Sequence, residues 1–68
     1  MAIIKELKGM TPQMGENCFL AETAVVIGDV KMGDDCSIWY GAVMRGDVNS
    51  ITLGNKVNVQ NGAVIQTK

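Results

Sequence analysis

The sequence predicts an all-β fold, a parallel β-solenoid of about three coils in a single domain covering residues 1–68. Aliphatic residues recur every six positions, a period that matches neither an α-helix, at about 3.6 residues, nor a simple strand, at about 2 residues. Glycine is frequent, β-branched residues are many and helix-forming residues are few, which argues against a helix bundle. A six-residue period is typical of a solenoid whose coils have three short flat faces.

Residues 1–13 do not keep this repeat, and we expect them to form an N-terminal cap. Ile3, Ile4 and Leu7 suggest a short strand or turn that lies over the first coil. Such a segment hides the first sheet edge of a solenoid. Pro12 marks the entry into the repeat, so the coils are predicted for residues 14–68.

Stacking the repeat by eighteen residues, which is one full coil of three hexads, places the aliphatic residues in three columns. These are Met14, Met32 and Leu53; Leu20, Ile38 and Val59; and Val26, Met44 and Ile65. Between them we expect tight corners, because Gly and Asp or Asn accept the φ values that turns need. The expected corners are Gly15–Glu16, Gly28–Asp29, Gly33–Asp34 and Gly54–Asn55.

The columns keep their register only if the chain spends three extra residues between Met44 and Leu53. We therefore expect a corner loop over residues 45–52, bulging within the run from Arg45 to Ser50. Insertions in solenoids lie on one face and often serve binding. This loop is therefore the first place to look for a functional site.

The two cysteines, Cys18 and Cys36, are one coil apart and should stack. Neighbouring coils lie about 4.8 Å apart, and in-register Cβ atoms at that spacing are slightly too far apart for a disulfide. We expect two small buried thiols that fill the core.

Composition excludes several classes of function. The net charge is −1 and no basic cluster exists, so we expect no nucleic-acid partner. No apolar run approaches the roughly 18 residues that span a bilayer, and the start resembles no signal peptide, so we expect no membrane association and a cytoplasmic location. A chain of this length is marginally stable alone, and oligomerisation usually helps.

Two runs carry a resemblance to a known family. The run from Ser37 to Val48 contains Trp39 and ends in the Arg45-Gly46-Asp47 turn, and the run from Leu53 to Gly62 contains Asn58-x-Gln60-x-Gly62. Together with the first hexads they make residues 19–65 resemble the γ-class carbonic anhydrase-like family of hexapeptide-repeat proteins. The resemblance implies a left-handed parallel β-helix, a homotrimer, and hydration of carbon dioxide to bicarbonate by a metal hydroxide.

The resemblance also implies a metal, which is zinc or else iron or cobalt in full-length members, bound by three histidines across the trimer interface. The first histidine falls at Gln66 of this chain, the other two fall past Lys68, and the chain contains no histidine. We therefore expect no metal site and no cofactor in this chain. We interpret it as the N-terminal portion of such a protein, truncated and inactive alone, with carbon dioxide or bicarbonate binding only where an intact site exists.

Site residues follow from the same resemblance. Arg45 and Asp47 are implied to form an ion pair at the subunit boundary, with Arg45 available to an anion such as bicarbonate. The alternative is an exposed salt bridge worth under about 1 kcal/mol. Gln60 is implied to hold a water or substrate oxygen beside the metal, or else it bonds a neighbouring coil. Trp39 should point outward. We interpret it as a trimer contact in preference to a surface on which a ligand stacks.

Two other functions remain open from the sequence. One is a fragment of a hexapeptide acyltransferase, a class that generally relies on a histidine as general base. The other is a non-catalytic trimeric β-helix scaffold. In either case the open last coil, residues 57–68, should present an unpaired parallel edge that favours end-to-end stacking.

Overall fold

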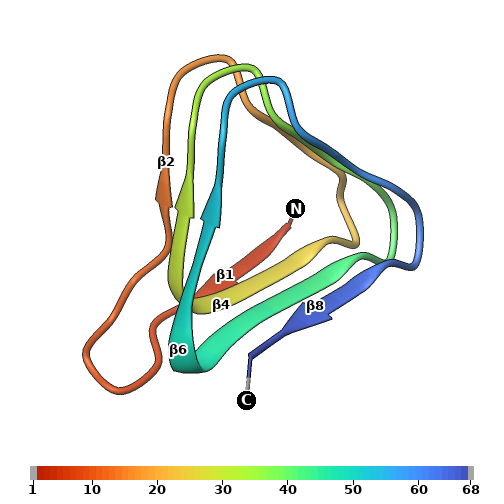
Figure 1. The fold of residues 1–68 in the computed structure, drawn as a ribbon. Coiled ribbons are helices and arrows are strands. Elements are labelled where there is room, and N and C mark those ends of the chain that lie inside the picture. Colours follow the sequence, from red (N-terminus) through yellow and green to blue (C-terminus); the bar gives the residue numbers. More distant parts are fainter. Residues whose placement is uncertain (1, 68) are drawn as a thin grey trace.

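The chain winds as a left-handed parallel β-helix of triangular cross-section (Figure 1), as predicted. The structure is a computed structural model that describes residues 2–67. Met1 and Lys68, the outer limits of the predicted cap and coils, lie outside the described residues. No helix of membrane-spanning length and apolarity occurs in the described range.

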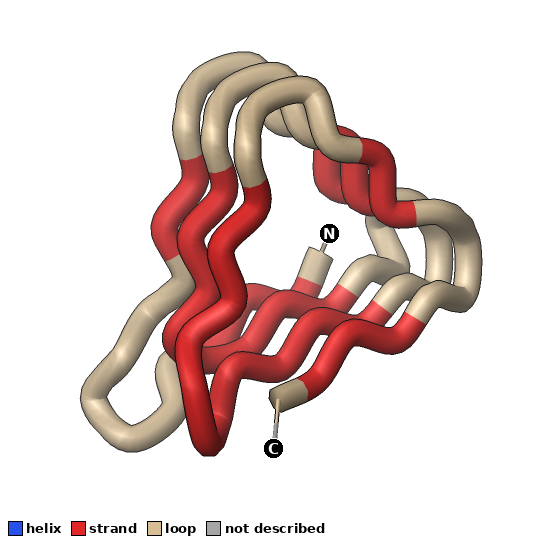
Figure 2. Tube along the Cα trace, viewed as in Figure 1, coloured by secondary structure: helices blue, strands red, loops and turns tan. Residues whose placement is uncertain are grey.

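Eight strands form the three faces. They are β1 (Ile3–Lys5), β2 (Gln13–Met14), β3 (Phe19–Leu20), β4 (Val25–Met32), β5 (Ser37–Ile38), β6 (Val43–Leu53), β7 (Asn58–Val59) and β8 (Val64–Gln66). The long strands β4 and β6 bend around a corner and contribute to two faces each, as Figure 2 shows. The first face has the order β1-β4-β6-β8, the second joins β2 to the ends of β4 and β6, and the third has the order β3-β5-β7.

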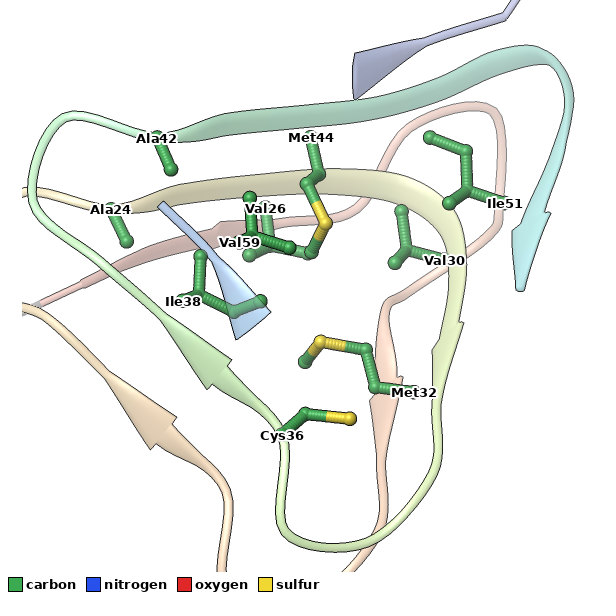
Figure 3. Close-up of a cluster of buried hydrophobic side chains, with 10 residues drawn as sticks. All are labelled: Ala24, Val26, Val30, Met32, Cys36, Ile38, Ala42, Met44, Ile51 and Val59. Carbon is green, nitrogen blue, oxygen red and sulfur yellow. The ribbon is translucent and has the colours of Figure 1, made fainter. Parts of the chain in front are cut away.

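Pairing registers confirm all three predicted columns. Met14 pairs with Met32 and Met32 with Leu53; Leu20 pairs with Ile38 and Ile38 with Val59; Val26 pairs with Met44 and Met44 with Ile65. The column members labelled in Figure 3 point into the prism, and among them Val26, Ile38 and Met44 are fully buried. Stacking like on like in this way lets each coil close the core of the next.

The three extra residues lie opposite Asp29. Gly28 pairs with Gly46, whereas Val30 pairs with Ile51, so residues 47–50 face a single residue of β4. We call residues 47–50 the corner insertion. Inside the expected 45–52 loop, Arg45 and Thr52 still pair with β4, because the ladder resumes on both sides of the insertion.

The N-terminal segment lies over the first coil as a short strand. Ile3 pairs with Val25 and Ile4 with Val26, so β1 adds a parallel rung to the first face. The chain then turns back on itself through a Leu7–Met10 antiparallel bridge and re-enters the helix at β2. This turn protrudes at the same corner as the bend of β6 (Figure 1).

One corner is built by side chains of the following coil. The Glu16 amide donates to Asp34 Oδ1 at 2.8 Å, and the Asp34 amide donates to Asn55 Oδ1 at 2.8 Å. We call this repeated contact the Asx ladder. A Cβ on Gly33 would lie 2.2 Å from Asn55 Oδ1, so glycine is required there to let the next coil approach.

The left-handed backbone at this corner is not where we expected it. The predicted corner glycines 15, 33 and 54 do not have positive φ; the left-handed residues are Asn17, Asp35 and Lys56, each with φ of 58°. The glycines serve close approach instead, because a neighbouring coil occupies the space of their missing Cβ atoms at Gly15 and Gly33. Of the expected corner glycines only Gly28, with φ of 80°, adopts the left-handed conformation.

Both cysteines are free, as predicted, and they differ in burial: Cys36 is fully buried and Cys18 only partly. Cys18 Sγ donates to the Gly33 carbonyl at 3.2 Å, and Cys36 Sγ donates to the Gly54 carbonyl at 3.1 Å. Each thiol is a weak donor, and each adds one contact between a coil and the next.

Candidate functional site

Four polar side chains gather where the bulge of the second coil meets the end of the third, and we call Arg45, Asp47, Gln66 and Thr67 the charged corner. Arg45 Nη2 donates to Gln66 Oε1 at 2.8 Å, and Arg45 Nε lies 3.4 Å from Asp47 Oδ2. The Thr67 hydroxyl donates to Asp47 Oδ1 at 3.3 Å. The structure contains the Arg45–Asp47 ion pair that the resemblance implies, and the place of this pair at a subunit boundary stays a prediction.

Strand geometry places these residues on the outside. Arg45 pairs directly with Gln66 across β6 and β8. Successive side chains of a strand point to opposite faces, so the inward Met44 and Ile65 put both polar residues on the outer surface. The Arg45 side chain remains 48% exposed and that of Asp47 26% exposed, so the pair is available to solvent and to a partner.

The surroundings of Asp47 favour its charged form. Desolvation raises the pKa of this carboxyl, but the hydrogen bond from the Val48 amide, the contact with its own amide, the Arg45 charge and the Thr67 hydroxyl together lower the pKa below its ordinary value. A lowered pKa means that the Asp47 contribution to stability is present above the ordinary pKa. This contribution is lost as the pH falls through the lowered value.

Trp39 lies on the outer side of the third face, half-buried by its own chain. Its ring centroid is 5.1 Å from that of Phe19, with the planes tilted by 54°, and its Nε1 donates to Asn58 Oδ1 at 3.0 Å. These contacts fix the indole while Phe19 stays 43% exposed. The predicted outward direction fits this geometry, and the trimer contact stays a prediction.

Gln60 lies apart from the charged corner along the coil. It is exposed in the turn after β7, where its carbonyl accepts a hydrogen bond from the Ala63 amide at 3.1 Å. Strand β8 then runs from this turn to Gln66, which lies at the other end of the face. Within one subunit Gln60 therefore lies before the start of β8, whereas Arg45 pairs with Gln66 at the end of β8. The predicted role of Gln60 stays a prediction.

The residues present do not fit the metal that the resemblance implies. No group of three His, Cys, Asp or Glu side chains within residues 2–67 could hold a metal ion, and this part of the chain encloses no pocket. Gln66, at the position that the resemblance implies for the first ligand, accepts a hydrogen bond from the Arg45 guanidinium. An amide oxygen beside a fixed positive charge is a poor zinc donor.

Thr67 is the member of the charged corner that sequence reasoning missed. Its hydroxyl accepts hydrogen bonds from the amides of Val48, at 3.3 Å, and Asn49, at 3.1 Å. The sequence contains one feature that could have identified it. If the three extra residues are placed correctly, Gln66 pairs with Arg45, and Thr67, the next residue, then lies beside the insertion. The precise position of the three extra residues was needed to use this feature.

Comparison with known proteins agrees with this architecture. The profile of the family described as bacterial transferase hexapeptide (six repeats) matches residues 11–46, slightly more than half of the chain. A carbonic anhydrase of Geobacillus kaustophilus is 40% identical over 63 residues, which is 93% of this chain and 35% of that protein. The mitochondrial gamma carbonic anhydrase 2 of Arabidopsis thaliana is 46% identical over 55 residues, which is 81% of this chain and 20% of that protein.

Protein YrdA of Escherichia coli is 35% identical over 63 residues, covering 93% of this chain and 34% of that protein. The chain thus spans about a fifth to a third of the length of these relatives. The residues that match the family profile include the first two members of each column and Arg45 of the charged corner. This chain therefore belongs to the hexapeptide-repeat family and, within it, to the γ-carbonic anhydrase-like proteins.

Proposed function

We propose that this chain is a γ-carbonic anhydrase-like β-helix module that associates with further copies and does not hydrate carbon dioxide by itself. The observation that carries the proposal is the 2.8 Å hydrogen bond from Arg45 to Gln66 in a chain without histidine. Catalysis by a zinc hydroxide needs three protein ligands and an open position for water. The position implied for the first ligand here holds an amide that is already paired with a cation.

The association part of the proposal is supported by the outer surface of the first face. Ile3, Val25, Val43 and Val64 stand opposite one another across β1, β4, β6 and β8. We call this row the outer stripe. Ile3 is 47% exposed and Val64 is 65% exposed. The next outward row contains Arg45 and Gln66, so an apolar row and the charged corner lie on one face.

A surface that joins apolar area to an ion pair is typical of subunit contacts, because the first provides burial and the second sets the orientation. The implied trimer would use this face together with Trp39. End-to-end stacking of the 68-residue polypeptide is a second mode, through the outer edges of β7 and β8. The two modes differ in the mass of the product, since a ring closes and a stack grows.

We expect the 68-residue polypeptide to sediment as a closed oligomer, with a trimer as the expected species, at micromolar concentration in analytical ultracentrifugation. Val64→Lys should shift it toward monomer, because a charge in the outer stripe must be desolvated on association. Met10→Lys is the matched control, since Met10 is 42% exposed but lies in the turn outside the stripe. A folded monomer that persists at high concentration contradicts the association proposal, and unlimited growth favours stacking over the ring.

We also expect zinc to leave the melting temperature unchanged. A zinc site at about 100 times its dissociation constant would stabilise the fold by about 2.7 kcal/mol, which raises the melting temperature of a small domain by about 10 °C or more. Differential scanning fluorimetry with zinc, with magnesium and with chelator makes the comparison. A rise that is specific for zinc would show that Gln66 or the carboxylates bind the metal after all.

The family description names transferases, and this favours the acyltransferase alternative as a second candidate. That class generally relies on a histidine as general base, which this chain lacks. Two of the relatives named above are called carbonic anhydrases, and the name of the third, protein YrdA, states no activity. The non-catalytic module therefore accounts for more of the observations.

A further inference from the structure

The backbone amides of the corner insertion need hydrogen-bond acceptors other than the regular β4–β6 ladder. Residues 47–50 face only Asp29 on β4, so they cannot all pair in register with it. Val48 is 63% exposed, which shows that the tip of the insertion is not held by apolar packing. Polar backbone groups that leave a ladder need other partners.

For the Val48 and Asn49 amides these partners are two side-chain oxygens. The Val48 amide donates to Asp47 Oδ1 at 2.9 Å and lies 3.3 Å from Thr67 Oγ1, and the Asn49 amide donates to Thr67 Oγ1 at 3.1 Å. Thr67 lies one residue beyond β8, in the coil that follows the insertion. The conformation of the insertion is therefore fixed from the next coil.

The Thr67 hydroxyl uses its full bonding capacity at this point. A hydroxyl has one proton to donate and two lone pairs that accept. The proton goes to Asp47 Oδ1, and the lone pairs face the two insertion amides. Because Oδ1 is held in this way, the other carboxylate oxygen, Oδ2, faces Arg45 Nε.

We infer that Thr67 is a positioning residue whose hydroxyl fixes the corner insertion and thereby aims the Asp47 carboxylate at Arg45. The role belongs to the hydroxyl and not to the side-chain volume, because each of the three contacts is a hydrogen bond. This positioning role is independent of the proposed function. Only the idea that the charged corner takes part in subunit contact rests on that proposal.

The test compares Thr67→Val, which keeps the shape and removes the hydroxyl, with Thr67→Ser, which keeps the hydroxyl. In hydrogen exchange of the 68-residue chain, the Val48 and Asn49 amides should exchange about fivefold to tenfold faster in Thr67→Val, as expected for one or two lost hydrogen bonds. The Trp39 amide, bonded to the Val59 carbonyl at 2.9 Å, is the internal control. Thr67→Ser should stay close to the parent chain.

A second measurement separates positioning from general loosening. The pKa of Asp47, followed by carboxyl NMR, should rise toward its ordinary value in Thr67→Val and remain lowered in Thr67→Ser, because the hydroxyl stabilises the carboxylate. Unchanged exchange in Thr67→Val, or a serine variant that behaves like valine, overturns the inference. If exchange rises as expected while the oligomer is unaffected, Thr67 positions the corner and the proposed contact role of Arg45 and Asp47 is wrong.

Discussion

Gly28→Ala should be among the most damaging single changes in this chain, lowering the free energy of unfolding by about 3 kcal/mol or more. Gly28 has φ of 80°, and a left-handed conformation costs an alanine roughly 1–2 kcal/mol. A Cβ there would also lie 2.5 Å from the Gly46 carbonyl oxygen. This oxygen belongs to the backbone of the next coil and cannot rotate away, so the corner has to open.

Alanine variants of two other glycines distinguish the cost of the left-handed backbone from the cost of the steric clash, when their free energies of unfolding are measured in urea. Gly62 has φ of 70° but no atom within 4 Å of a built Cβ, so Gly62→Ala should show only the conformational cost of about 1–2 kcal/mol. Gly54 has neither constraint, and its alanine variant should stay within about 0.5 kcal/mol of the parent. Equal losses for Gly28→Ala and Gly62→Ala would mean that the corner relaxes around the added methyl group.

Ile38→Ala should remove about 2–5 kcal/mol of stability through the cavity that it creates. Ile38 is fully buried at the centre of the third face, with Leu20 on one side and Val59 on the other. The loss therefore affects contacts among all three coils. A chain of this length is expected to have about 3–10 kcal/mol in total, so a large part of the population should unfold at 37 °C.

The measurement is chemical denaturation at one fixed protein concentration, because association changes apparent stability. Ile38→Val provides the graded comparison, with an expected loss of about 0.5–1.5 kcal/mol. Val48→Ala is the surface control and should change stability by less than about 0.5 kcal/mol, since Val48 is 63% exposed. An Ile38→Ala variant as stable as the surface control would contradict the stacked core.

The repeat was sufficient to predict the core. A six-residue period and an eighteen-residue coil place Met14 over Met32 and Val26 over Met44 without any knowledge of the corners. The same count locates the three extra residues between Met44 and Leu53. The period does not extend to β1, because the turn between Lys5 and Gln13 interrupts it. The aliphatic pair Ile3 and Ile4 nevertheless led us to expect a short strand or turn over the first coil, and β1 forms such a strand.

The corners were harder to predict because two physical demands compete there. Close approach of the next coil requires glycine at Gly33, while the left-handed turn residue is Asp35, two positions later. Our expectation for these corners rested on the turn conformation alone, for which Gly and Asp or Asn are suited, and did not include the close approach of the next coil. The charged corner was predicted only for Arg45 and Asp47, because the contact to Thr67 depends on which residues the insertion contains and on how the next coil meets it.

The Asx ladder has a consequence for how such proteins change length. At this corner the Glu16 and Asp34 amides each donate to a side-chain oxygen of the coil that follows, so Asp34 both accepts such a bond and donates one. A complete coil therefore presents a side-chain acceptor to the coil before it and a backbone amide donor to the coil after it. Duplication or deletion of one whole coil leaves every remaining junction intact, whereas gain or loss of a partial coil breaks one. Descendants of such a chain should accordingly differ by integral turns, with irregular additions confined to the corner that already accommodates residues 47–50.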